Sequence, residues 1–204
     1  MTLTLWLSLL TVCLLGAMSP GPSLAMVAKH SLAGGRMNGL ATAWAHALGI
    51  GVYAFITLIG LAVVLQQSPF LFKAISYAGA WYLAYLGYQA LRSKGGVAEK
   101  LESGIQTSLC TSAKEGLLIS LLSPKIALFF IALFSQYVSV GNTLSAQSII
   151  VITPFLVDGL WYTLVTFLLS SSRLIEKIRS KARFIDRLSG AVLILLAIRV
   201  LLTV

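Results

Sequence analysis

The stretch LLTVCLLGAMSPGPSLAMVA, residues 9–28, decides the fold. It is mostly apolar, yet Ser19-Pro20-Gly21-Pro22 interrupts it near its centre. Proline lacks a backbone N–H and clashes with the preceding helical turn, so a continuous helix is not expected across this phrase. Inside a bilayer a broken helix is tolerated only where protein or a watery cavity covers the break. The stretch therefore predicts a broken transmembrane helix whose break faces the protein interior.

A second apolar stretch, LISLLSPKIALFFIALF at residues 118–134, carries a similar interruption, Ser123-Pro124-Lys125. Broken helices at corresponding positions in two halves of a membrane protein point to the binding site of a transporter. A simple proline kink, held by neighbouring helices, would explain either phrase alone. Because the phrase is repeated, we favour a small transporter with its site near Pro20 and Pro124.

The composition is typical of a membrane protein. The 204-residue chain is 58% hydrophobic and 10% charged, with a mean hydropathy of +0.92, whereas soluble domains carry about 25% charged residues. A net charge of +9 would suggest a nucleic-acid partner for a soluble protein. Here the basic residues lie between apolar segments, and no nucleic-acid recognition motif accompanies them. No basic residue precedes Lys29, so a cleaved signal peptide is not expected.

Six segments are long and apolar enough to cross a bilayer, which takes about 20 residues each. They are residues 3–28, 39–65, 70–91, 116–138, 146–171 and 188–204. All but three of the 15 lysines and arginines then fall in the connections after the first, third and fifth segments. Basic connections stay in the cytoplasm, so both termini are predicted to face outward.

The two halves of the chain resemble each other weakly. Residues 1–92 and 114–204 would each hold three spans, on either side of a polar cytoplasmic linker at 93–113. The corresponding positions are Pro20 and Pro124, Gly51 and Gly159, and Gly79 and Gly190. Since three is an odd number, the second half would enter the membrane in the opposite direction, as in many secondary transporters. Chance similarity between apolar helices is the alternative.

The Ser-Pro phrases also suggest a ligand. Ser is a good N-cap and Pro suits the first helical position, so each phrase is expected to end one half-helix and begin another. The new helix N-termini carry partial positive charge and free N–H groups, which suit the carboxylate of an amino acid. The candidate substrate-binding residues on these phrases are Ser19, Pro20, Gly21, Pro22, Ser123, Pro124 and Lys125.

Three ionisable residues lie well inside predicted spans. Asp158 and Lys125 both fall near the midplane if helical rise is counted from the cytoplasmic boundary. An ionisable residue at that depth is a functional candidate by default. The two residues form an ion pair, or Asp158 holds a substrate ammonium or takes up a coupling proton. His46 is either a proton relay or a hydrogen-bonded packing residue.

Aromatic residues recur in the third span, where Tyr77, Trp81 and Tyr85 share one helical face. Together with Tyr53, Trp161 and Tyr162 they either line a pathway or pack against neighbouring helices, and packing is the favoured interpretation.

Several motifs together resemble a known family. Ser19-Pro20-Gly21-Pro22, followed by Gly34-Gly35-Arg36 and Gly39, looks like the lysine exporter family, and more narrowly its homoserine/threonine resistance branch. Ser123-Pro124-Lys125 is similar to that family's Asn-Pro-Lys motif, with Ser in place of Asn. The region around Asp158-Gly159-x-Trp161 and residues 185–190 also fit. The change from Asn to Ser leaves the substrate preference open.

The resemblance implies a bacterial inner-membrane exporter of amino acids or their derivatives, driven by proton exchange, with both termini periplasmic. It implies no cofactor, no metal and no catalytic residue, because the chain is expected to be a transporter and not an enzyme. Asp158 and His46 are the candidate proton-coupling residues. The expected partners are an amino-acid substrate, protons and the lipid bilayer, and a homodimer is left open as the assembly.

Two other functions compete with export of amino acids. A membrane thiol-redox carrier would need two cysteines that meet, whereas Cys13 is expected in the outer half of the first span and Cys110 on the cytoplasmic side. A metal or small-ion exporter would need more His, Cys and carboxylate ligands than one membrane Asp and one His supply.

Overall fold

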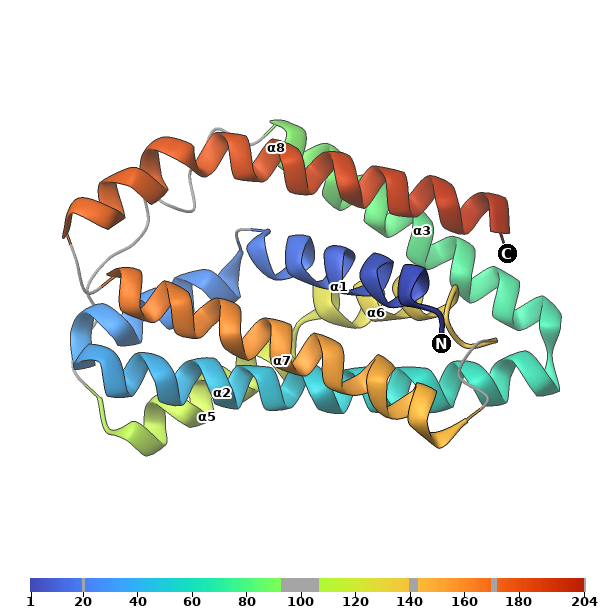
Figure 1. The fold of residues 1–204 in the computed structure, drawn as a ribbon, viewed down its shortest axis with the longest axis horizontal. Helices are drawn as coiled ribbons and strands as arrows, with labels where there is room; N and C mark the ends of the chain where they lie inside the picture. The colour runs from blue at the N-terminus through green and yellow to red at the C-terminus, as the bar shows by residue number, and fades with distance from the viewer. Residues whose placement is uncertain (20, 93–106, 140–142, 170–171, 204) are drawn as a thin grey trace.

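The computed structural model describes residues 1–19, 21–92, 107–139, 143–169 and 172–203, and all regular structure within them is helical (Figure 1). The helices are α1 (Leu3–Met18), α2 (Pro22–Gln67), α3 (Pro69–Arg92), α5 (Leu109–Leu121), α6 (Pro124–Phe134), α7 (Leu144–Leu169) and α8 (Ser172–Thr203). Most of the predicted linker, residues 93–106, and also Pro20, lie outside the described residues. The linker's last residues, 109–113, belong to the start of α5.

Helix α2 consists of two arms that meet at Gly35. The backbone torsions there are φ 76° and ψ −171°, and glycine adopts positive φ far more readily than other residues. The chain reverses at this point, so the arm of residues 22–34 runs back beside the longer second arm (Figure 1). The arms are so close that a Cβ on Gly39 would collide with Ser31. α1 and the first arm therefore replace the single predicted span 3–28.

The two Ser-Pro phrases break their helices in different ways. α5 and α6 meet at an angle of 53°, and the Ser123 hydroxyl caps α6 by accepting the N–H of Ile126 at 3.4 Å. At the other phrase, Ser19 is the C-cap of α1, and α2 begins at Pro22 with no side-chain cap. The predicted Ser-Pro N-cap is confirmed at Ser123 and wrong at Ser19, because Pro22 occupies the first helical position of α2.

The helices pack around the two breaks. α2 contacts α5 and α7 along much of its length, α3 pairs with α8, and α1 lies against α7 and α8. In Figure 1 both breaks fall near the middle of the long axis of the molecule. The side chains buried between the helices include Leu9, Leu83, Phe134, Ile150 and Val200.

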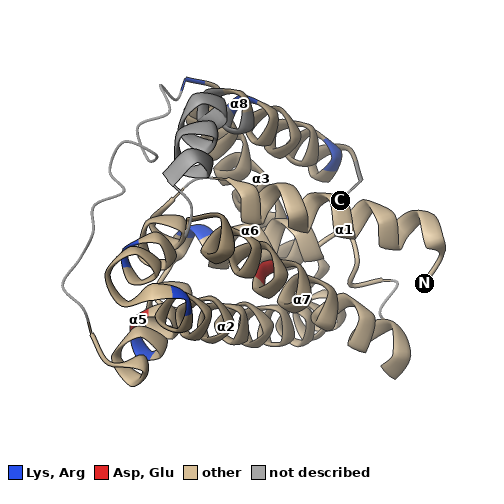
Figure 2. Cartoon of the chain, turned by 60° about the vertical axis from the view of Figure 1, so that its left-hand side comes forward, with Lys and Arg blue, Asp and Glu red and all other residues tan. Residues whose placement is uncertain are grey.

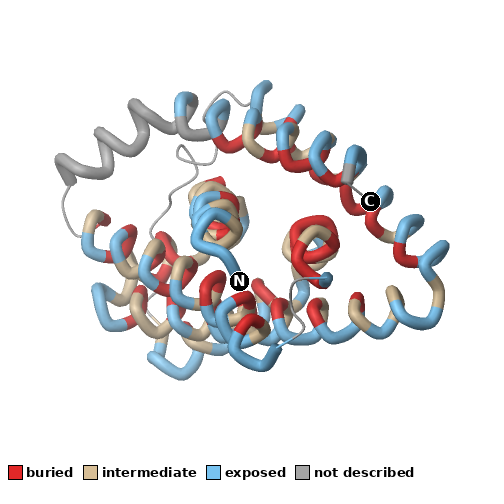
Figure 3. The backbone as a smooth tube through the Cα atoms, turned by 45° about the vertical axis from the view of Figure 1, so that its right-hand side comes forward, coloured by how far each residue is buried: buried red, intermediate tan, exposed pale blue. Residues whose placement is uncertain are grey.

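The outer faces of the helices carry many large apolar side chains. In Figure 3 the exposed residues, in pale blue, lie mostly on the sides of the helices that face away from the centre of the molecule. Soluble monomers rarely expose apolar surface on this scale, which marks a face that lipid covers. Tyr77, Trp81 and Tyr85 belong to this face, with 37%, 71% and 54% of their surface exposed. Neither the pathway nor the packing interpretation is right for these three residues, because α3 turns them outward.

Within the part of the chain that the structure describes, α2 and α7 are long and apolar enough to cross a membrane, and the bent pair α5 and α6 would be a third span. The chain is therefore a multi-pass helical membrane protein, as predicted. Both termini lie at the same end of the molecule (Figure 1), and the described lysines and arginines gather mostly toward the other end (Figure 2). This distribution follows the predicted separation of basic connections from the termini.

Candidate functional site

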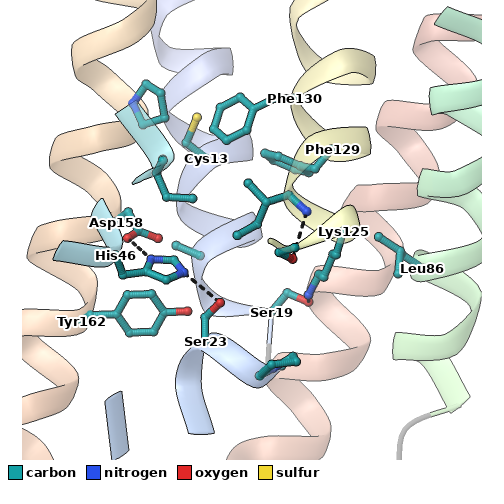
Figure 4. Close-up of a pocket in the computed structure, with 18 of the residues that line it drawn as sticks. Cys13, Ser19, Ser23, His46, Leu86, Lys125, Phe129, Phe130, Asp158 and Tyr162 are labelled. Carbon is teal, nitrogen blue, oxygen red and sulfur yellow. Dashed lines mark hydrogen bonds and ion pairs between the residues drawn. The ribbon is translucent and has the colours of Figure 1, made fainter. Parts of the chain in front are cut away.

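A cavity lies where the two broken helices approach each other. Its empty volume is about 730 Å³, a figure that includes the part open to its surroundings. The lining residues are Cys13, Gly16, Ala17, Ser19, Gly21, Pro22, Ser23, His46, Ile50, Leu86, Ser123, Lys125, Ile126, Phe129, Phe130, Pro154, Asp158, Tyr162 and Leu193. Figure 4 shows one polar group around Lys125 and another around Asp158.

Lys125 forms the cationic side of the cavity. It follows Pro124 in the first turn of α6, and its ammonium Nζ donates a hydrogen bond to Oγ of Ser19 over 3.1 Å. A Cβ built on Gly21 would lie 3.5 Å from Nζ, so the ammonium also lies beside the start of α2. Helix N-termini carry partial positive charge. Two helix starts and one ammonium therefore concentrate positive potential here, and an anion is the ligand that such a group attracts.

Asp158 forms the anionic side of the cavity. Its Oδ2 lies 2.7 Å from Nδ1 of His46, whose Nε2 lies 2.9 Å from Oγ of Ser23 (Figure 4). When Asp158 is ionised, Nδ1 of His46 carries a proton and donates a hydrogen bond to the carboxylate. In the neutral ring Nε2 accepts from the Ser23 hydroxyl, and in the protonated ring Nε2 donates to it. Oδ1 of Asp158 has no hydrogen-bond partner among the described residues. This carboxylate can therefore hold its histidine and still bind a cationic group through Oδ1.

Small residues bring these groups together. A Cβ on Gly159 would lie 2.8 Å from the Trp44 ring, so glycine allows α7 to approach the second arm of α2 closely enough for Asp158 to reach His46. The reversal at Gly35 returns the first arm, which carries Ser23, to the same place. The ring of Tyr162 packs edge-on against His46, with centroids 5.2 Å apart, and fixes the plane of the imidazole.

Most of the predicted site residues meet at this cavity. Ser19, Gly21, Pro22, Ser123, Lys125, Asp158 and His46 all line it. Pro124 is not among the lining residues, and Pro20 lies outside the described residues. The alternative of an ion pair between Lys125 and Asp158 is wrong, because Asp158 pairs with His46 and Lys125 donates to Ser19.

The sequence interpretation missed Ser23, Cys13 and the two phenylalanines of α6 as lining residues. Phe129 lies four residues after Lys125, a spacing that places both side chains on one face of a helix. This spacing could have identified Phe129 as a lining residue once Lys125 was taken as a site residue. Of the aromatic residues proposed for a pathway, Tyr162 lines the cavity, whereas the Tyr53 hydroxyl donates to the carbonyl of Leu121 at 2.7 Å.

A second polar group, buried at its centre and partly exposed at Lys29 and Glu115, lies between α2 and the start of α5, and we call it the α2–α5 polar cluster. Its members are Lys29, His30, Asn38, Thr42, Thr107, Ser112 and Glu115. The His30 ring bridges α2 and α5, with Nε2 3.0 Å from Glu115 and Nδ1 3.0 Å from Ser112. Lys29 donates to the same Glu115 oxygen at 2.8 Å. None of these residues lines the cavity.

The fold and the cavity together define a helical membrane protein in which a lysine and an aspartate line one cavity between broken helices. The model of the LysE type translocator family matches residues 14–203, so the chain belongs to that family. Membership confirms the predicted family and identifies the chain as a transporter and not an enzyme.

Several bacterial proteins are similar along most of their length. An uncharacterised membrane protein of Haemophilus influenzae is 30% identical over 91% of this chain and 90% of its own. The threonine efflux protein of Escherichia coli K12 is 29% identical over 93% of both chains. The leucine efflux protein of Enterobacter sp. is 27% identical over 87% of this chain and 83% of its own. No solved structure matches the chain.

The cysteines do not form a redox pair in this fold. Cys13 is buried on α1 beside the cavity, Cys110 is exposed in the first turn of α5, and both are free thiols. A carrier that shuttles electrons through a disulfide needs sulfurs that can meet. The arrangement thus disfavours the thiol-redox alternative.

Proposed function

We propose that this protein exports amino acids from the bacterial cytoplasm across the inner membrane in exchange for protons. The observation that carries the proposal is the pairing of opposite charges across one cavity, with Lys125 and two helix N-termini on one side and Asp158 on the other. A free amino acid carries one carboxylate and one ammonium on the same carbon atom, so it offers an opposite charge to each side of the cavity. Relatives named as threonine and leucine efflux proteins support the same substrate class.

In this proposal the substrate carboxylate binds beside Nζ of Lys125, where Ser19 and the start of α2 supply further donors. The uncapped N–H groups of α2 are available because Gly21 has no side chain to satisfy them. The substrate ammonium binds Oδ1 of Asp158. Each charge then finds an opposite partner, which is the condition under which buried charges are tolerated.

Proton exchange operates at the same acid. Substrate ammonium and proton compete for Asp158, because both neutralise one carboxylate. His46 contacts that carboxylate and Ser23, and it passes the proton between Asp158 and the first arm of α2. Asp158 and His46 thus act as the proton-coupling pair.

The architecture is six spans in two inverted repeats, residues 1–92 and 114–204, joined by the linker 93–113. Contacts of α2 with α7 and of α3 with α8 support it, since a two-fold axis would bring matching helices together. A Cβ on Gly87 would lie 2.7 Å from the Gly190 carbonyl, and one on Gly190 2.6 Å from the Gly87 carbonyl. Such reciprocal contacts are expected at an axis. These contacts make Gly87, and not Gly79, the counterpart of Gly190. Rocking of the two halves would open the cavity alternately to the cytoplasm and to the periplasm.

Both termini face the periplasm in this proposal, and a native thiol can test it. Cys110 is exposed at the basic end of the molecule and Cys13 is buried. A membrane-impermeant maleimide should label Cys110 in inside-out vesicles and leave right-side-out vesicles unlabelled, with Cys110→Ser as the control. Labelling confined to right-side-out vesicles would reverse the orientation.

Export itself is tested by uptake of radiolabelled amino acids into inside-out vesicles that contain the protein. Uptake should accelerate when the lumen is more acidic than the outside, and a protonophore should abolish that acceleration. Uptake that ignores the gradient would overturn proton exchange. Vesicles that accumulate none of the 20 standard amino acids above the level of protein-free vesicles would overturn the function.

A further inference from the structure

We infer that the cavity selects amino acids with apolar side chains, such as leucine, over threonine and over charged amino acids. The inference rests on the proposed function and specifies its substrate class. It follows from what remains of the cavity wall once the carboxylate and the ammonium of a substrate have been placed.

Most polar side chains of the lining belong to those two charged groups or to the helix breaks, and the Tyr162 hydroxyl contacts Ser23. Ser19 and Lys125 serve the carboxylate side, Ser123 caps α6, and Ser23 and His46 belong to the Asp158 side. Tyr162 lies against His46 on that same side. A third substituent on the substrate Cα therefore meets the remaining wall.

The remaining wall is apolar. Phe129 and Phe130 of α6 pack edge to face with centroids 5.5 Å apart, and Figure 4 shows both rings above the space between Asp158 and Lys125. Ile126 and Leu193 from α6 and α8 extend the same surface. Burial of apolar substrate surface against such a wall is favourable, at about 25 cal/mol per Å².

The position of Phe129 is set by a glycine on the facing helix. A Cβ on Gly16 would lie 2.8 Å from Cζ of the Phe129 ring, so any larger residue at position 16 would push the ring away from α1. Glycine here lets the ring lie against α1 and leaves the space beside it for a branched side chain. Phe129 is thus the specificity-determining residue of this wall.

The wall disfavours other side chains for different reasons. A threonine side chain buries less apolar surface than leucine, and its hydroxyl loses water without gaining a partner on this wall. A lysine or glutamate side chain would place a charge among the phenylalanine rings, which is more unfavourable still. The expected order of preference is leucine, then threonine, then lysine.

The test measures KM for leucine, threonine and lysine with the full-length protein in inside-out vesicles. The KM for leucine should be about 10-fold lower than for threonine, the size of discrimination that one or two apolar groups provide. Threonine or lysine transported with the lower KM would overturn the inference and leave the proposed function standing. Transport of no amino acid would overturn both.

A matched pair of variants connects the preference to the wall. Phe129→Ala should reduce the leucine-to-threonine preference about 10-fold and improve transport of the larger phenylalanine. Phe134→Ala makes the same change on the same helix at a buried position that does not line the cavity. It should leave the preference unchanged, whatever it does to the amount of folded protein. An equal change of preference in both variants, or in neither, would overturn the assignment of Phe129.

Discussion

Two histidines in this protein are equally buried and both pair with an acid, but they belong to different kinds of site. His46 and His30 are each 1% exposed, and their ring nitrogens lie 2.7 Å from Asp158 and 3.0 Å from Glu115. His46 and its acid line a cavity, and Oδ1 of Asp158 has no hydrogen-bond partner among the described residues. His30 is enclosed in the α2–α5 polar cluster, where Lys29 and Ser112 complete the contacts.

The difference shows that burial and an acidic partner do not identify a functional histidine. What distinguishes His46 is that its acid lines a cavity, where the proposed mechanism places the substrate and the proton. A network with every member satisfied holds structure together. We therefore expect changes at the cavity to alter transport, and changes in the α2–α5 polar cluster to alter stability.

The largest effect is expected from Asp158→Asn. It removes the charge that binds the substrate ammonium, so transport should fall about 100-fold, since truncation of a buried charged partner costs about 2 to 5 kcal/mol. The measurement is uptake per folded protein in inside-out vesicles, with and without a pH gradient. Glu115→Gln, which changes the acid of the other histidine, is the control and should retain transport. Asp158→Asn with normal rate and normal response to the gradient would refute the role of Asp158.

Lys125→Gln should have the next largest effect. It keeps much of the side-chain length and removes the charge opposite the substrate carboxylate, so KM should rise about 30-fold, or about 2 kcal/mol. Lys125→Arg keeps the charge and should recover part of the affinity. An unchanged KM in Lys125→Gln would show that the helix N-termini bind the carboxylate without the ammonium.

His30→Gln tests whether the second histidine of the comparison serves stability and not transport. Loss of the bridge from α2 to Glu115 and Ser112 should reduce stability by about 1.5 kcal/mol and lower the melting temperature in detergent by roughly 3 to 6 °C. KM for the folded fraction should stay at the wild-type value. A raised KM with unchanged melting would place the α2–α5 polar cluster in the transport pathway.

The smallest effect concerns the two serines of the helix breaks. Ser123→Ala removes a helix N-cap and should cost about 1 kcal/mol, seen as a melting temperature lowered by about 2 to 4 °C. Ser19→Ala removes no N-cap, and its main effect should be on KM through the contact with Lys125. Equal loss of stability in both variants would contradict the unequal capping of the two breaks.

The sequence predicted the features that depend on local chemistry. The proline breaks, the all-helical membrane fold and the choice of Lys125 and Asp158, which both line the cavity, follow from residues whose properties are unusual inside an apolar segment. The N-cap at Ser19 was wrong because two prolines compete in that phrase, and only the packed structure decides between them. The outward direction of Trp81 was missed because helical spacing gives a shared face without saying which way it points.

The partners of the ionisable residues depend on contacts between distant segments. His46 meets Asp158 because Gly159 admits Trp44, and Ser23 reaches His46 because Gly35 reverses the chain. Neither glycine signals these contacts in the sequence. His30 and Ser112 are 82 residues apart, and each looks unremarkable by itself. Pairwise assignments of this kind require the packed fold.

The central claim is that one cavity binds both the carboxylate and the ammonium of an amino acid. Binding of three related molecules tests this claim directly. Leucine carries both charges, its methyl ester lacks the carboxylate charge, and 4-methylpentanoate lacks the ammonium. Purified wild-type protein should prefer leucine over either analogue by about 30-fold in competition with radiolabelled leucine. Lys125→Gln should lose only the preference over the ester, and Asp158→Asn only the preference over 4-methylpentanoate. Equal preferences in the wild type and both variants would contradict the claim.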